Sequence, residues 1–90
     1  MEVKKKLKVK NELGLHARSA AMIVELAKKH NAKLYFKKGE QIIEGDSILS
    51  LLTLACPKGT ELEVKAVGED AQMLIDELTA LFERGFGELS

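Results

Sequence analysis

The stretch from Glu2 to Lys29 reads EVKKKLKVKNELGLHARSAAMIVELAKK and changes its hydrophobic period once. From Glu2 to Lys10 apolar and polar residues alternate, which is typical of a half-buried strand with one solvated face. From Ala17 to Lys29 the apolar residues recur at helical spacing. The members of this apolar stripe are Ala20, Ile23, Val24 and Ala27. The stretch therefore predicts a strand, a loop and an amphipathic helix, in that order.

The rest of the chain continues in short elements of the same two kinds. Alternation predicts strands at 32–37 and 61–66, and the short turn Lys38-Gly39-Glu40 leads into a further strand around 41–44, which would form a hairpin with the strand at 32–37. A short apolar helix is predicted over 48–54, with Asp46 or Ser47 as its N-cap. A third helix runs from Ala71 to Phe82, with Asp70 as its candidate cap.

These elements predict an α+β fold in the order β-α-β-β-α-β-α. Each strand has one apolar face and each helix has one apolar stripe. We therefore expect helices and sheet to bury these faces against each other in two layers. We expect an open-faced β-sandwich, in which three helices cover one face of a four-stranded, mainly antiparallel sheet. Residues 1–90 are expected to form a single domain.

Composition excludes several classes of protein. The 90 residues carry 14 basic and 14 acidic side chains, and this balance argues against a nucleic-acid partner. No apolar run is long enough to span a bilayer, and the N-terminus lacks the features of a signal peptide. The single cysteine, Cys56, fits a reducing compartment. We expect a soluble, cytoplasmic protein that does not insert into membranes.

Most kinds of chemical site are missing from the sequence. There is no Cys-x-x-Cys motif, and His16 and His30 have no metal-ligand spacing around them, so neither a metal nor a cofactor is expected. Glycine-rich nucleotide-binding motifs are absent as well.

The remaining candidate is the junction between the first loop and the first helix, Gly14-Leu15-His16-Ala17-Arg18-Ser19. A helix start leaves N–H groups unpaired and carries partial positive charge, which suits an anion. His16 would supply a nucleophilic imidazole there, and the guanidinium of Arg18 matches phosphate oxygens. The alternative is a polar cap followed by an ordinary surface arginine, and the short spacing alone favours that alternative.

Two segments together resemble the HPr family, the histidine-containing phosphocarriers of the bacterial phosphoenolpyruvate-dependent phosphotransferase system. The first is Asn-Glu-Leu-Gly-Leu-His-Ala-Arg-Ser-Ala at 11–20, and the second is Asp-Ser-Ile-Leu-Ser-Leu-Leu-Thr-Leu-Ala at 46–55. The second segment and the ending Phe82-x-x-Gly85-Phe86 are somewhat closer to the NPr-like nitrogen branch. The sequence does not decide between the sugar and nitrogen branches.

The resemblance implies a phosphoryl-group carrier rather than an enzyme that turns over a metabolite. Its implied acceptor is Nδ1 of His16, which would take phosphate from Enzyme I and pass it to a IIA-type protein. Arg18 would stabilise the phosphate, and Ala17 and Ser19 are candidates for the phosphate cradle. Ser19 stands where the family usually has proline, so its N–H or its hydroxyl is expected to face the phosphate.

The second helix is expected to contribute a docking surface and a regulatory site. Two helical turns cannot bury all five of its large apolar residues, so Ile48, Leu49 and Leu52 are expected to form an exposed patch. Complete burial of the helix is the alternative. The resemblance also makes Ser47 a candidate for phosphorylation by an HPr kinase/phosphorylase, whereas a purely structural reading makes it an N-cap.

Two other functions compete with the relay. One is an HPr-like regulator that signals through docking and phosphorylation state, and the other is an unrelated α/β sandwich that binds a ligand. Retention of His16 argues against a histidine-free regulator, and the sequence offers no ligand set for the sandwich.

Overall fold

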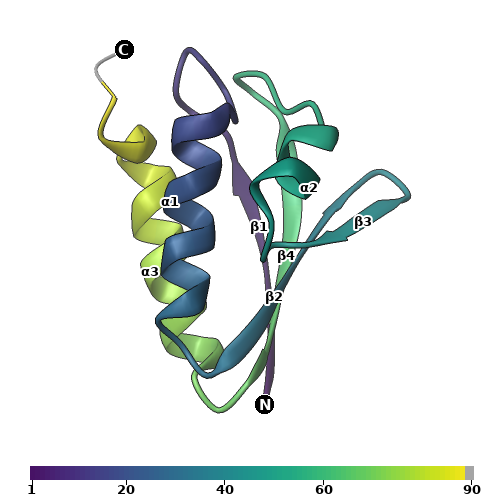
Figure 1. The fold of residues 1–90 in the computed structure, drawn as a ribbon, viewed down its shortest axis with the longest axis vertical. Helices are drawn as coiled ribbons and strands as arrows, with labels where there is room; N and C mark the ends of the chain where they lie inside the picture. Colours follow the sequence, from purple (N-terminus) through teal and green to yellow (C-terminus); the bar gives the residue numbers. More distant parts are fainter. Residues whose placement is uncertain (89–90) are drawn as a thin grey trace.

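Four strands, three α-helices and a final 3₁₀ turn make up the computed structural model, which describes residues 1–88 (Figure 1). The strands are β1 Glu2–Lys8, β2 Ala32–Lys38, β3 Gln41–Glu44 and β4 Glu61–Gly68. The helices are α1 Ala17–Lys28, α2 Ile48–Thr53 and α3 Ala71–Glu83, and the 3₁₀ turn is Gly85–Gly87. This is the predicted order of elements, with boundaries that differ by one or two residues.

The sheet has the strand order β1-β4-β2-β3, and each neighbouring pair is antiparallel. The register places Leu7 opposite Leu62 and Phe36 opposite Val64, so buried side chains meet across the strands. Lys4 lies opposite Lys65, and Lys4 is exposed. The three helices cover one side of the sheet, as Figure 1 shows. The predicted open-faced sandwich is therefore confirmed.

The core lies between the helices and the sheet. The apolar stripe of α1 contributes Ala20, Ile23 and Val24, all of them buried. Helix α3 contributes a longer buried row, which consists of Ala71, Leu74, Ile75, Leu78, Leu81 and Phe82. Each large apolar side chain buried here stabilises the fold by roughly 1.5–3 kcal/mol. Within residues 1–88, no helix has both the length and the apolar character needed to cross a bilayer.

Helices α1 and α3 lie side by side and run in opposite directions (Figure 1). At one end of the pair, Nε2 of His30 lies 2.7 Å from a carboxylate oxygen of Glu77. Asp70 occupies the N-cap position of α3, but its side chain does not cap that helix. The Asp70 carboxylate instead accepts a hydrogen bond from the Asn31 N–H at 2.8 Å. At the other end, the last turn of α3 lies beside the first turn of α1 (Figure 1).

Candidate functional site

His16 is the N-cap residue of α1, at the end of the loop that follows β1. Its backbone is extended (φ −127°, ψ −178°), and its carbonyl accepts the first helical hydrogen bond from the Ala20 N–H at 2.8 Å. The N–H groups of Ala17 and Arg18 precede that bond and have no acceptor within the helix, whereas the Ser19 N–H faces the His16 side chain in a capping box. The His16 side chain is 31% exposed. The predicted histidine therefore lies at the positive end of a helix dipole, open on one side to solvent.

The loop before His16 is anchored to the segment that follows α2. Gly14 has a φ of +68°, and a Cβ at this position would lie 2.3 Å from the Cys56 carbonyl oxygen. That same carbonyl accepts a hydrogen bond from the Leu15 N–H at 2.8 Å. Only glycine allows this close approach together with a positive φ. The anchor places the His16 backbone relative to α2.

Ser19 is completely buried, and its hydroxyl serves the helix start rather than the surface. Ser19 Oγ accepts a hydrogen bond from the His16 N–H at 3.0 Å. The same oxygen lies 3.2 Å from the carbonyl oxygens of Gly14 and His16, to either of which it can donate. The prediction that this hydroxyl could face a phosphate is therefore wrong, because buried backbone groups already use it. The Ser19 backbone N–H already takes part in the capping box with the His16 side chain, so it could join the cradle only by giving up that contact.

The chain turns back toward His16 after α3. Gly85, Phe86 and Gly87 all have positive φ values, and Phe86 is buried, with its ring centroid 4.9 Å from that of Phe82. This turn delivers Glu88 to the imidazole, where Oε2 of Glu88 lies 2.6 Å from Nε2 of His16. The Glu88 side chain is only 12% exposed. Sequence reasoning missed this contact, which joins residues 72 positions apart.

A second missed residue, Asn11, completes the arrangement around Glu88. Asn11 Nδ2 donates to Glu88 Oε1 at 2.9 Å and to the Gly14 carbonyl at 2.7 Å. The hydrogen bonds from Asn11 and His16 hold the pKa of the Glu88 carboxyl below its usual value, with a further contribution from the charge of Arg18. The ionised form of Glu88 is therefore favoured, and its negative charge lies next to His16.

Arg18 is exposed in the first turn of α1, two residues after His16. Among residues 1–88, no carboxylate forms an ion pair with its guanidinium. The side chain can reorient toward an incoming anion at little cost, because it breaks no ion pair with the described part of the chain. Ala17, between the two, is exposed as well, so the start of the helix is accessible.

Helix α2 presents part of its apolar surface to solvent. Leu51 and Leu54 are buried, but Leu49 is 75% exposed and Ile48 is also exposed. Leu52, which was expected to be exposed with them, is only partly exposed because it packs against the core. Ser47 is the N-cap of α2, and its Oγ accepts a hydrogen bond from the Ser50 N–H at 3.3 Å.

Leu13 adds a further exposed apolar side chain, in the loop three residues before His16. It is 69% exposed. An apolar residue in a turn next to a candidate site was the feature of the sequence from which this exposed side chain could have been predicted.

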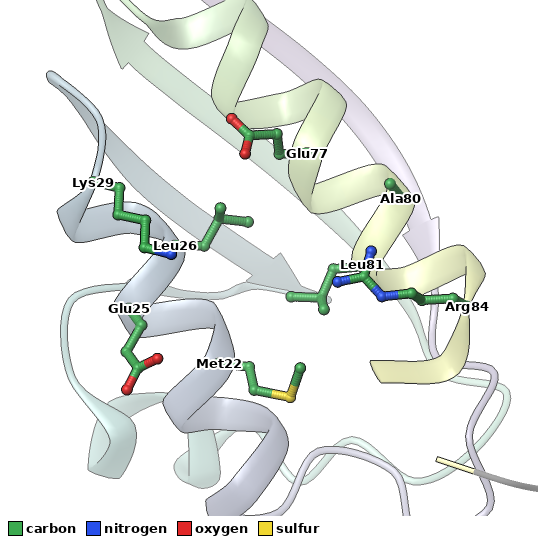
Figure 2. Close-up of a pocket in the computed structure, with 8 residues that line it drawn as sticks. All are labelled: Met22, Glu25, Leu26, Lys29, Glu77, Ala80, Leu81 and Arg84. Atoms are coloured by element: carbon green, nitrogen blue, oxygen red, sulfur yellow. The ribbon is translucent and has the colours of Figure 1, made fainter. Parts of the chain in front are cut away.

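A surface groove of about 250 Å³ lies between α1 and α3 (Figure 2). Met22, Leu26 and Leu81 form its apolar part, and Arg84 lies at its α3 side. None of the predicted site residues lines this groove. The predicted residues instead gather at the start of α1 and on α2.

Comparison with known proteins identifies relatives of this chain. The sequence profile of a family described as "PTS HPr component phosphorylation site" matches residues 3–84. The phosphocarrier protein NPr of Escherichia coli K12 is 35% identical over 89 residues, which cover 98% of this chain and 99% of that protein. A multiphosphoryl transfer protein of Haemophilus influenzae is 40% identical over 83 residues, which cover 89% of this chain but 17% of that longer protein.

Solved structures agree with these matches. The crystal structure of HPr-C-His from Thermoanaerobacter tengcongensis superposes with a TM-score of 0.93 at 31% sequence identity. The superposition covers 98% of this chain and 99% of that one. The shared architecture therefore extends over nearly the whole length of both chains.

Proposed function

Because the chain belongs to the HPr family of phosphocarriers of the phosphotransferase system, we propose that it accepts a phosphoryl group on His16 from Enzyme I and passes it to a IIA-type protein. The observation that supports the proposal is the position of His16 at the N-cap of α1, where its side chain is partly exposed beside the N–H groups of the first helical turn. Phosphoryl transfer depends mainly on alignment and on stabilisation of charge. A helix start supplies both.

The two ring nitrogens of His16 are in different surroundings. Nε2 is hydrogen-bonded to the Glu88 carboxylate, whereas Nδ1 has no side-chain partner among residues 1–88 and faces the backbone N–H of Ser19 in the capping box of α1. In this proposal Nδ1, the ring nitrogen that does not contact the carboxylate, accepts the phosphate. The Ala17 N–H and the guanidinium of Arg18 would receive the phosphate oxygens, and the Ser19 N–H would join them by exchanging the His16 ring for phosphate.

The partner surface in this proposal consists of Leu13, Ile48 and Leu49, which we call the apolar patch. All three side chains are exposed. Helix α2, which carries two of them, packs against α1, which carries the phosphate site. Exposed apolar side chains beside a reactive group fit transient docking of a partner protein. Enzyme I and the IIA-type protein would use this surface in turn.

A regulatory protein that signals through docking is the second candidate function. The exposed apolar patch and the N-cap Ser47 beside it would serve such a role equally well. The two functions differ in what happens to the phosphate, because a relay must donate it onward. Genes for Enzyme I and IIA proteins beside this gene would favour the relay.

The decisive experiment is incubation with Enzyme I and phosphoenolpyruvate, followed by intact-mass spectrometry. The relay requires a mass increase of one phosphoryl group that is lost on brief acid treatment. It also requires that a IIA-type protein added afterwards removes the label. Acceptance without onward donation would favour the regulatory function.

Replacing Arg18 by alanine should slow phosphoryl transfer from Enzyme I by about tenfold while the site remains competent. One charge-assisted contact to phosphate contributes roughly 1.5–3 kcal/mol, and an exposed arginine delivers the lower part of that range. Rapid-quench kinetics would measure the rate. The matched control is Arg84→Ala, since Arg84 lies in the groove between α1 and α3. Equal rates for the two variants would remove Arg18 from the mechanism.

A negative charge at Ser47 should weaken the relay without unfolding the protein. Ser47→Asp keeps a side-chain acceptor at the N-cap of α2, and the helix dipole favours the charge. The same charge lies beside Ile48 and Leu49, so docking must desolvate it. We expect an unchanged melting temperature and a KM for transfer from Enzyme I that rises by about tenfold.

The variant Ser47→Ala separates this effect from loss of the cap, which costs about 1 kcal/mol of stability. That variant should melt earlier and accept phosphate normally. Normal acceptance by Ser47→Asp would reduce Ser47 to a structural cap. Weakened acceptance would support control by an HPr kinase/phosphorylase, whose product carries its charge at this position.

A further inference from the structure

Glu88 is held at the His16 ring more firmly than a surface glutamate would be. Its Oε1 accepts a hydrogen bond from Asn11 Nδ2 at 2.9 Å, and its Oε2 lies 2.6 Å from His16 Nε2. Asn11 is almost completely buried and also donates to the Gly14 carbonyl, so its amide is fixed in place. The carboxylate therefore occupies one position, set by a buried residue on the first loop.

The end of the chain has an anchor besides Glu88. Phe86, two residues earlier, is already buried against Phe82 and anchors the turn. Glu83, in contrast, pairs on the surface with Lys10, where both side chains are well exposed. The carboxylate of Glu88 is thus the one that reaches the reactive ring.

The carboxylate determines which nitrogen of His16 carries the proton. An ionised carboxylate can only accept hydrogen bonds, so the nitrogen beside it, Nε2, must be the donor. A neutral imidazole has a single N–H, and Nδ1 then retains its lone pair. The ring is also prevented from rotating, because rotation would break the contact with Glu88.

We infer that Glu88 is a positioning residue for phosphoryl transfer: it holds the proton on Nε2 of His16, leaves the lone pair on Nδ1, and offsets the positive charge that the ring gains. The inference rests on the proposed function, since it assigns a role in phosphate acceptance at His16. Asn11 supports it indirectly by holding Glu88.

The chemical step balances without a further reactant. The donor is a phosphohistidine on the partner protein. The Nδ1 lone pair of His16 forms a bond to phosphorus, the P–N bond of the donor breaks, and its electron pair returns to the donor ring. No proton leaves Nε2 during the step. Donating the lone pair makes the His16 ring cationic, and the carboxylate 2.6 Å away stabilises that charge.

Two variants separate the charge of Glu88 from its role as an acceptor. Glu88→Gln fills the same space and keeps an acceptor oxygen but removes the charge, whereas Glu88→Ala removes both. The matched control is Glu83→Gln, which removes a carboxylate from the same region with no contact to His16. Rapid-quench transfer from phosphorylated Enzyme I should be about tenfold slower for Glu88→Gln, at least as slow for Glu88→Ala, and unchanged for the control.

The ring nitrogens provide a readout that a purely structural role would not change. In the wild-type protein at alkaline pH, the ¹⁵N shifts of His16 should be those of a ring protonated at Nε2 alone. In Glu88→Ala the two shifts should move toward each other, because both tautomers become populated. Wild-type transfer rates in both Glu88 variants would overturn the inference. A slower rate with unchanged ring shifts in Glu88→Ala would also overturn it, because it would place Glu88 in partner docking.

Failure of this inference is distinguishable from failure of the proposed function. If the wild-type protein takes no acid-labile phosphate on His16, the proposed function fails, and the role of Glu88 fails with it. If the wild-type protein is labelled on His16 and the Glu88 variants match it, only the role of Glu88 fails. Should Glu88→Ala not fold, the isosteric Glu88→Gln decides the question through its transfer rate.

Discussion

His16→Ala should abolish acid-labile phosphorylation by Enzyme I and phosphoenolpyruvate while the protein stays folded. The loss is complete because the variant has no ring nitrogen at the start of α1. The fold survives because the His16 side chain is partly exposed and does not belong to the buried core. Intact-mass spectrometry measures the label, and circular dichroism measures the fold. We expect a change in stability of about 1 kcal/mol, as for other N-cap replacements.

The chain offers a matched control in its second histidine. His30 lies at the far end of α1, beside Glu77 rather than Glu88. His30→Gln should therefore be labelled like the wild-type protein. Label that persists in His16→Ala, or disappears in His30→Gln, would place the acceptor elsewhere.

Gly14→Ala should destabilise the protein by about 2–5 kcal/mol and displace the phosphate site. An alanine at a φ of +68° costs about 1–2 kcal/mol, and a Cβ placed 2.3 Å from the Cys56 carbonyl oxygen adds roughly 1–3 kcal/mol as the backbone shifts. Such a loss is a large part of the total stability of a small domain. Urea denaturation measures it, and transfer from Enzyme I should slow because Gly14 sets the loop that carries His16.

Gly39→Ala is the control for this prediction. Gly39 also has a positive φ, +59°, but a Cβ there would have no neighbour within 4 Å. Its replacement should cost only the conformational part, about 1–2 kcal/mol. Equal losses for the two variants would show that the close approach to Cys56 contributes nothing.

The elements of the fold could be predicted because each has a clear hydrophobic period. The alternation at 61–66 and the helical stripe of α3 are local patterns, and local patterns determine which face is buried. The strand order is less local, and the two-layer solution followed from the need to cover every apolar face. Boundaries were less predictable. The pattern of β1 continues through Lys10, but the strand ends at Lys8, although Val9 remains buried.

Candidate site residues were predictable in identity but not in orientation. His16 and Arg18 could be selected because a histidine and an arginine at a helix start have a recognisable chemistry. The direction of the Ser19 hydroxyl depends on the carbonyls of Gly14 and His16, which only the folded loop brings near. Asp70 was similar, because its carboxylate accepts a hydrogen bond from the N–H of Asn31, just before β2, instead of capping its own helix.

Glu88 and Asn11 could not be predicted from any local pattern. Asn11 reads as an ordinary turn residue, and only burial makes its amide a rigid donor. Glu88 reaches His16 because three successive residues with positive φ reverse the chain after α3. Contacts between the two ends of a sequence leave no periodic signal, so they become visible only in three dimensions.

The strand order β1-β4-β2-β3 also limits when β1 can join the sheet during folding. β1 pairs only with β4, and α1, β2, β3 and α2 all lie between them in the chain. β1 therefore cannot form its hydrogen bonds to β4 until β4 has been synthesised. Pairing between strands so far apart in the sequence slows folding. Until β4 has paired with it, both edges of β1 are open, and in the finished sheet β1 remains an edge strand. Its lysines at positions 4, 5, 6 and 8 discourage pairing with strands of other chains. The same lysines thus keep the folded sheet soluble along this edge and protect the incompletely folded chain from aggregation.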